Sequence, residues 1–105
     1  MEVELEIDDK SYTVTVPKAL IEEAEDFFVK MDADMDDGWQ MSRCWIPKPD
    51  QTQRCQIVAD KLLTAITSEN ESYASLLCAY ILKAKPATKR ILLNTDGEIQ
   101  GNGFL

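Results

Sequence analysis

Apolar and polar residues alternate at the start of the chain. Val3, Leu5 and Ile7 are separated by glutamates, which is the period-two pattern of a strand with one face in water. Asp8-Asp9-Lys10 has turn chemistry, and a second alternating stretch follows it. We therefore predict an N-terminal β-hairpin, whose row of glutamates discourages edge-to-edge association. The apolar positions of the second strand are Tyr12, Val14 and Val16.

The next stretch has the spacing of a helix. Apolar residues recur every three or four positions from Leu20 to Met35. Pro17 stands where the first helical turn accepts proline, and Gly38 is well placed to end the helix. This pattern predicts one amphipathic helix over about residues 17–36.

Residues 38–50 have no clean period, and Pro47 and Pro49 exclude a regular helix there. We predict a long loop, a kind of segment that often carries function in compact domains.

Two further helices are predicted after this loop. Each follows a capping-box pattern, Asp50-x-x-Gln53 for the first and Ser68-x-x-Glu71 for the second. Pro86 ends the second helix, and the short join between the two predicts an antiparallel helical hairpin.

The end of the chain predicts a second β-hairpin. Residues 91–93 form a short buried-strand run, Asp96-Gly97 is a hairpin-turn signal, and residues 98–104 return as a weaker strand. The element order is then ββ-α-loop-αα-ββ. We predict a single α+β domain over residues 1–105, with one mostly antiparallel four-stranded sheet and three helices packed on one face.

Charge is distributed unevenly along the 105 residues. The net charge is −8, and residues 1–50 hold 14 acidic against five basic side chains. Such a chain is repelled by nucleic-acid phosphates and by anionic membranes, so we expect it to bind neither. The basic residues of segment 83–90 are a local exception, but bases at the end of a helix also complement its dipole.

Histidine is absent, which excludes the usual general base, histidine-assisted nucleophiles and most zinc sites. Cys44, Cys55 and Cys78 are odd in number and lack a C-x-x-C spacing. We expect free thiols in a reducing, cytoplasmic setting. A catalytic Cys44 beside Arg43 would need an unusual base, and no glycine-rich phosphate loop is present, so we expect no cofactor.

Acidic residues cluster before Gly38, at Asp32, Asp34, Asp36 and Asp37. A calcium loop of the EF-hand type is excluded, because a loop starting at Asp32 puts Arg43 where a bidentate glutamate is needed. Carboxylates at a helix C-terminus oppose its dipole, which leaves three explanations. The helix ends near Met31, or Arg43 and segment 83–90 neutralise the cluster, or the surface is kept acidic for a basic partner or a weakly bound divalent ion.

Both tryptophans, Trp39 and Trp45, lie within seven residues of each other, with Arg43 between them. Tryptophan and arginine dominate binding hot spots, because one brings a large rigid ring and the other planar, charge-assisted hydrogen bonds. Alternatively, both indoles close the end of a small core. In a mixed case, one indole anchors the loop while the other faces a partner together with Arg43.

These features predict a small acidic interaction or regulatory domain, not an enzyme, that binds a basic protein partner and is a monomer or homodimer. The alternative is a small-ligand or divalent-metal sensor whose pocket lies between loop 38–50 and the helices. An enzyme with a carboxylate acid–base pair is the third hypothesis. The predicted partner-binding residues are Asp34, Asp36, Asp37, Trp39, Arg43 and Trp45.

Overall fold

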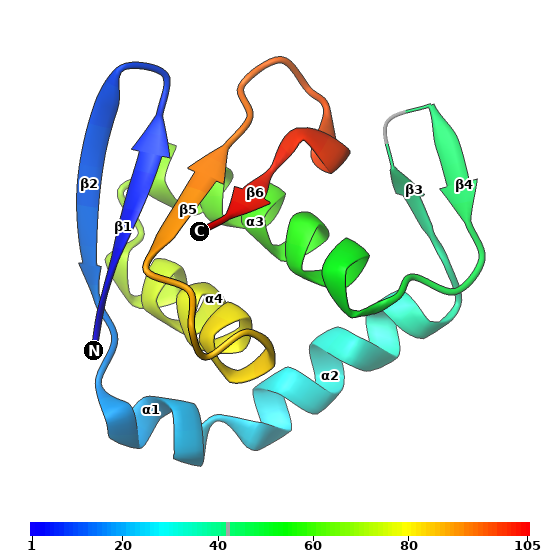
Figure 1. Cartoon of the computed structure of the whole chain (residues 1–105). Coiled ribbons are helices and arrows are strands. Elements are labelled where there is room, and N and C mark those ends of the chain that lie inside the picture. Colours follow the sequence, from blue (N-terminus) through cyan, green and yellow to red (C-terminus); the bar gives the residue numbers. More distant parts are fainter. Residues whose placement is uncertain (42) are drawn as a thin grey trace.

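The protein folds around a four-stranded sheet, in a computed structural model that describes residues 1–41 and 43–105 (Figure 1). The strand order is β2-β1-β5-β6, with β1 and β5 parallel and the two outer pairs antiparallel. The prediction of a mostly antiparallel sheet is therefore wrong, because the sheet is mixed. Parallel neighbours need a crossover connection, and the helices between β2 and β5 supply it. The strands are β1 (Glu2–Ile7), β2 (Lys10–Thr15), β5 (Arg90–Leu93) and β6 (Gly103–Phe104).

The alternation along β1 separates an apolar face of the sheet from a charged one. Val3 and Leu5 are buried, and Leu5 pairs with Ile91 of β5, which is also buried. On the opposite face, the Arg90 guanidinium lies 3.4 Å from the carboxylate of Glu4 and 3.8 Å from that of Glu6. The predicted N-terminal hairpin is confirmed by the pairing of β1 with β2. On β2, however, Tyr12 is 41% exposed, so the apolar face predicted for the second strand is only partly buried.

In the part of the chain that the structure describes, only α3 (Gln51–Thr67) and α4 (Glu71–Ala84) lie against the apolar face of the sheet, where they run antiparallel to each other (Figure 1). The prediction that all helices pack on the sheet is therefore wrong, because the earlier helical segments lie farther from it. The single helix predicted over residues 17–36 is divided at Ala24, so the described chain contains four α-helices and not three. Glu22 and Asp26 would repel each other at i and i+4 in an unbroken helix. The break also lets the first segment contact α4. The helices are α1 (Lys18–Glu23), α2 (Glu25–Asp36), α3 (Gln51–Thr67) and α4 (Glu71–Ala84).

One of the two predicted capping boxes forms. Asp50 Oδ1 accepts a hydrogen bond from Gln53 N at 2.8 Å, and Asp50 N donates to Gln53 Oε1 at 2.9 Å. The second prediction is wrong, because Asn70 and not Ser68 caps α4 by accepting from Tyr73 N at 3.2 Å. A residue with positive φ, Glu69 at 57°, makes the tight join between α3 and α4.

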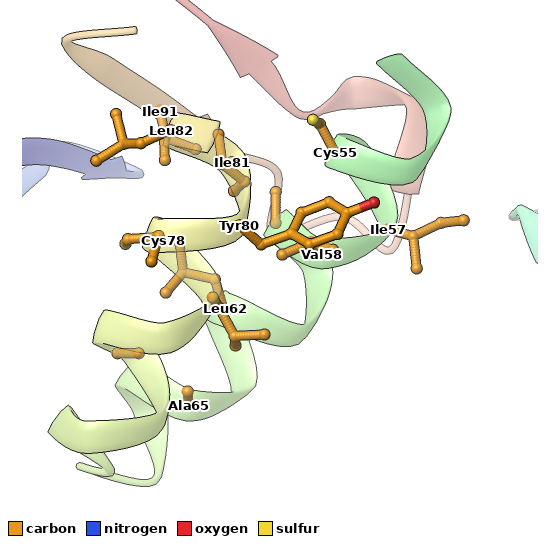
Figure 2. Packing of buried hydrophobic residues seen from close by; sticks show 14 of the residues in the cluster. Cys55, Ile57, Val58, Leu62, Ala65, Cys78, Tyr80, Ile81, Leu82 and Ile91 are labelled. Carbon is orange, nitrogen blue, oxygen red and sulfur yellow. The ribbon is translucent and has the colours of Figure 1, made fainter. Parts of the chain in front are cut away.

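The core lies between the sheet and the two long helices and continues to Phe28, Met31 and Met35 of α2. Figure 2 shows its packing around Cys55, Leu62 and Ile91, with Tyr80 at one side. These side chains are almost completely buried. No helix in the described part of the chain is both long enough and apolar enough to cross a membrane.

A polar contact fixes the C-terminal segment on α3. The predicted return strand is reduced to the two residues of β6, preceded by the 3-10 helix η1 (Ile99–Gly101). Asn102 is buried, and its side chain donates to Gln56 O at 3.0 Å and accepts from Asn94 N at 2.7 Å. Asn102 thus holds together α3, the end of β5 and β6.

Replacement of Asn102 by alanine should lower the free energy of unfolding by about 2 kcal/mol, because two backbone polar groups lose their partner. Urea unfolding followed by circular dichroism measures this change. Gln100→Ala is the control, because Gln100 is exposed and contributes its backbone carbonyl to the contact. Equal stabilities of the two variants would contradict the role given to Asn102.

Candidate functional site

Part of the predicted loop 38–50 is a second, two-stranded sheet. The strands β3 (Trp39–Met41) and β4 (Cys44–Ile46) pair antiparallel as a short hairpin. The hairpin stands apart from the four-stranded sheet, at the end of α2 (Figure 1). The prediction of a segment without regular structure is therefore wrong for its first half. The two prolines used to exclude a helix lie after β4, where they do not disturb the pairing.

The register of the hairpin places the two indoles on opposite faces. Trp39 pairs with Ile46, and both are packed against the core. Trp45 pairs with Gln40 on the other face, and its side chain is 58% exposed. The indoles are arranged as in the mixed case considered from the sequence, in which one tryptophan anchors the segment and the other is accessible.

Gly38 makes the position of the Trp45 indole possible. Its φ is +105°, which favours glycine, and a Cβ there would lie 2.5 Å from Cζ2 of Trp45. The same Cβ would lie 3.0 Å from the carbonyl oxygen of Ile46. The indole therefore packs directly against the backbone that joins α2 to β3. Its position thus depends on where α2 ends.

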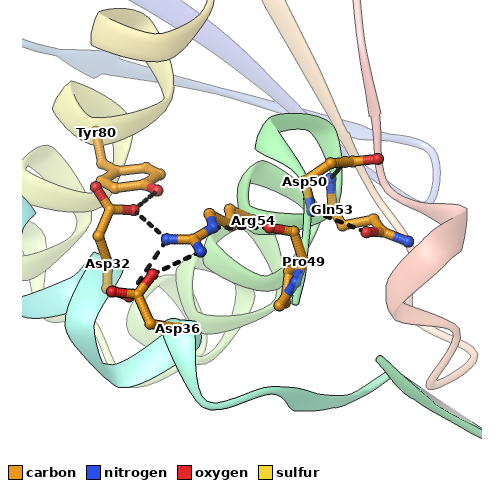
Figure 3. A network of polar contacts seen from close by, with 7 residues as sticks. All are labelled: Asp32, Asp36, Pro49, Asp50, Gln53, Arg54 and Tyr80. Carbon is orange, nitrogen blue, oxygen red and sulfur yellow. Dashed lines mark hydrogen bonds and ion pairs between the residues drawn. The ribbon is translucent and has the colours of Figure 1, made fainter. Parts of the chain in front are cut away.

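The acidic cluster belongs to α2, which continues to Asp36, so the explanation that the helix ends near Met31 is wrong. Two of its carboxylates bind Arg54 of α3 (Figure 3). The Arg54 guanidinium lies 3.1 Å from Asp32 and 2.7 Å from Asp36. Internal neutralisation does occur for these two aspartates, but the cation is Arg54 and not Arg43 or segment 83–90.

Arg54 also hydrogen-bonds to the backbone on both sides of the hairpin. Its Nε donates to Pro49 O at 2.9 Å, and Nη1 donates to Asp32 O at 3.3 Å (Figure 3). Burial opposes the charge of the guanidinium, but hydrogen bonds to Asp36 and Asp32 outweigh it and raise the pKa of Arg54. Arg54 therefore remains a cation and joins α2, α3 and the segment that follows β4.

Tyr80 of α4 completes the network from the other side. Its hydroxyl donates to Asp32 Oδ1 at 2.5 Å. Burial and this hydrogen bond raise the pKa of Tyr80 well above its ordinary value, so the phenol keeps its proton. Three helices thus meet at the carboxylate of Asp32.

The other predicted site residues remain accessible. Asp34, Asp37 and Arg43 are exposed, and among residues 1–41 and 43–105 none of them takes part in an ion pair. Asp36 is held by Arg54, although its side chain is 60% exposed. Trp39 is half-buried, with Lys61 Nζ 4.8 Å from the centre of its ring.

Arg54 and Lys61 are two residues of the site that the sequence analysis missed. They are the only cations of α3 and stand seven residues apart. Positions i and i+7 share one face of a helix. Their spacing predicts a basic stripe on α3, but the sequence does not indicate which helix faces it.

The thiols differ in accessibility. Cys44 is exposed, whereas Cys55 and Cys78 are buried. Burial raises the pKa of Cys55 to about 11 and that of Cys78 to about 12, so both are poor nucleophiles. In the described part of the chain, no three Cys, Asp or Glu side chains are grouped closely enough to hold a metal ion.

Comparison with models of known families, with curated proteins and with solved structures finds no match. The proposed function is therefore based on the geometry of the site.

Replacement of Arg54 by alanine should lower the free energy of unfolding by about 2 kcal/mol, because two carboxylates and two carbonyls lose a charged donor. Urea unfolding measures the change. Arg43→Ala is the matched control and should change stability by less than about 0.5 kcal/mol, because Arg43 is exposed. Equal effects of the two substitutions would contradict the role of Arg54 in joining the helices.

Stability should fall as the pH rises above about 8.5, where thiols of the unfolded chain ionise. Cys55 and Cys78 keep their protons in the folded state because their pKa values are raised. The unfolded state then binds fewer protons than the folded state, so rising pH favours unfolding. Urea midpoints measured under reducing conditions from pH 7 to about pH 10.5 test this slope.

Cys78→Ala should make that slope shallower, whatever its effect on stability at pH 7. Leu77→Ala removes a buried side chain that has no ionisable group and should leave the slope unchanged. If stability decreased with pH equally in both variants and in the unsubstituted protein, the attribution of this decrease to the Cys78 thiol would be contradicted.

Proposed function

We propose that this protein is an interaction protein that binds a basic protein partner, with no catalytic role. The contact surface is the outer face of the β3–β4 hairpin with the exposed carboxylates at the end of α2. The proposal rests on one observation: the Trp45 indole is exposed and packs against the backbone at Gly38. The residues proposed to touch the partner are Trp45, Arg43, Asp37 and Asp34, with Asp36 at the margin.

Trp45 has the properties of a binding anchor. Large apolar side chains that remain exposed are few in the described chain, and Trp45 offers the largest ring among them. Its position against the backbone at Gly38 reduces the rotamer freedom that binding would otherwise remove. Burial of a rigid indole at the centre of an interface commonly supplies a large share of the affinity.

The charge of α1 and α2 supports a basic partner. Residues 18–37 carry eight carboxylates and two lysines, and the single positive charge of Arg54 is shared by two of the eight. The negative field that remains would speed association with a positively charged surface and repel nucleic acids. Arg43, in the hairpin turn, would add hydrogen bonds to a carboxylate or carbonyl of the partner.

Trp45 is proposed to supply affinity and the carboxylates to supply electrostatic attraction. Substitutions at the two should therefore change partner binding in different ways. Trp45→Ala should weaken binding at least about 30-fold, since interface hot spots contribute 2 kcal/mol or more. Asp37→Asn should have a smaller effect, which disappears as salt screens the charges. Tagged protein captures the partner from a native extract, and titration calorimetry with the purified pair gives the affinities.

Val29→Ala is the matched control, because Val29 is 59% exposed and lies on α2 away from the hairpin. A partner that binds Trp45→Ala as tightly as the unsubstituted protein would contradict the proposed surface. Circular dichroism of each variant keeps loss of binding distinct from loss of fold.

A further inference from the structure

A pocket opens on the inner side of the hairpin, away from Trp45. It has a volume of about 230 Å³ and lies between α2, β3, α3 and α4. Phe27, Trp39 and Tyr73 form aromatic walls, and the rings of Phe27 and Tyr73 meet edge to face with centres 6.3 Å apart. Pockets for drug-sized ligands commonly measure about 300–1,000 Å³. The size here suits a smaller molecule with an apolar part.

Charges of both signs line the same pocket. Lys30, Asp34 and Lys61 contribute to its lining. Lys61 Nζ lies over the Trp39 ring, while Lys30 and Asp34 are one turn apart on α2. Across residues 1–41 and 43–105, none of the three is engaged in an ion pair. Two ammonium groups and one carboxylate are thus available beside an aromatic wall.

We propose that this pocket binds a free amino acid with an apolar side chain. The ammonium groups of Lys30 and Lys61 hold its carboxylate, the carboxylate of Asp34 holds its ammonium, and its side chain lies against the aromatic walls. A purely anionic ligand would be repelled by Asp34. A divalent cation would meet one carboxylate and two positive charges. The pocket shares Asp34 with the proposed partner-binding surface, but Trp45, Arg43 and Asp37 do not line it.

Two methionines provide a direct readout. Met31 and Met35 line the pocket, whereas Met1 and Met41 do not. Protein labelled with ¹³C at the methionine methyl groups is titrated with L-leucine, L-isoleucine and L-phenylalanine up to about 10 mM, because ligands this small bind weakly. We expect the methyl signals of Met31 and Met35 to move with saturation, and that of Met1 to stay.

Leucine analogues test recognition of both charges. L-leucinamide lacks the carboxylate and 4-methylpentanoate lacks the ammonium group, so each should bind about 10-fold more weakly than L-leucine. Lys30→Ala and Asp34→Ala should weaken L-leucine binding to a similar degree. Lys18→Ala is the matched control, because Lys18 is also an exposed helical lysine but lies outside the pocket.

Trp45→Ala should leave amino-acid binding unchanged, which keeps failure of this proposal distinct from failure of the partner-binding surface. The proposal is overturned if none of the three amino acids moves the Met31 and Met35 signals. It is also overturned if the two analogues bind as well as L-leucine, or if Lys30→Ala binds like Lys18→Ala. Amide spectra of the variants verify that each remains folded.

Discussion

The position of the hairpin depends on one cation, Arg54, shared between two carboxylates of α2. Without Arg54, the last turns of α2 would carry like charges toward the negative end of the helix dipole. With it, Asp32 and Asp36 are held at 3.1 Å and 2.7 Å, and the carbonyl of Pro49 is held at 2.9 Å. The two ends of the segment that contains the hairpin are therefore joined to the same guanidinium. This guanidinium is largely buried, but the Asp32 and Asp36 side chains are 45% and 60% exposed, so solvent still screens part of the contact.

The hairpin in turn separates two kinds of surface. Its inner face carries Trp39, which contributes to the core and to the charged pocket. Its outer face carries Trp45, which contributes little to the core and rests on Gly38. Antiparallel pairing alternates the faces along each strand, so two tryptophans six positions apart can have opposite environments. One short element thus serves a proposed ligand pocket and a proposed protein contact, and Asp34 belongs to both.

Local signals in the sequence predicted the local parts of this structure. The alternation of β1 and the capping box at Asp50 depend on neighbouring residues, and both form as predicted. The parallel pairing of β1 with β5 depends on the path of the intervening helices, which no short pattern specifies. The partner of the aspartates lies 18 to 22 positions away, at Arg54. The pairing across that distance is set by packing of α2 on α3, so the sequence indicated that the charges needed compensation but not its source.

The carboxylates of α2 also differ in what they contribute to the fold. Asp32 joins three helices and Asp36 joins two, so both have a structural reason to be acidic. Asp37 follows the last residue of α2 and faces the negative end of the helix dipole. Among the described residues no cation pairs with Asp37, so its charge opposes folding and does not support it. A charge that the helix dipole disfavours, next to an exposed indole, supports the proposed binding surface, because local rules are most often broken at functional sites. The difference between the paired and unpaired aspartates supports a partner contact centred on Asp37 and Trp45. The ion pairs of Arg54 with its two aspartates hold the end of α2 that carries this contact.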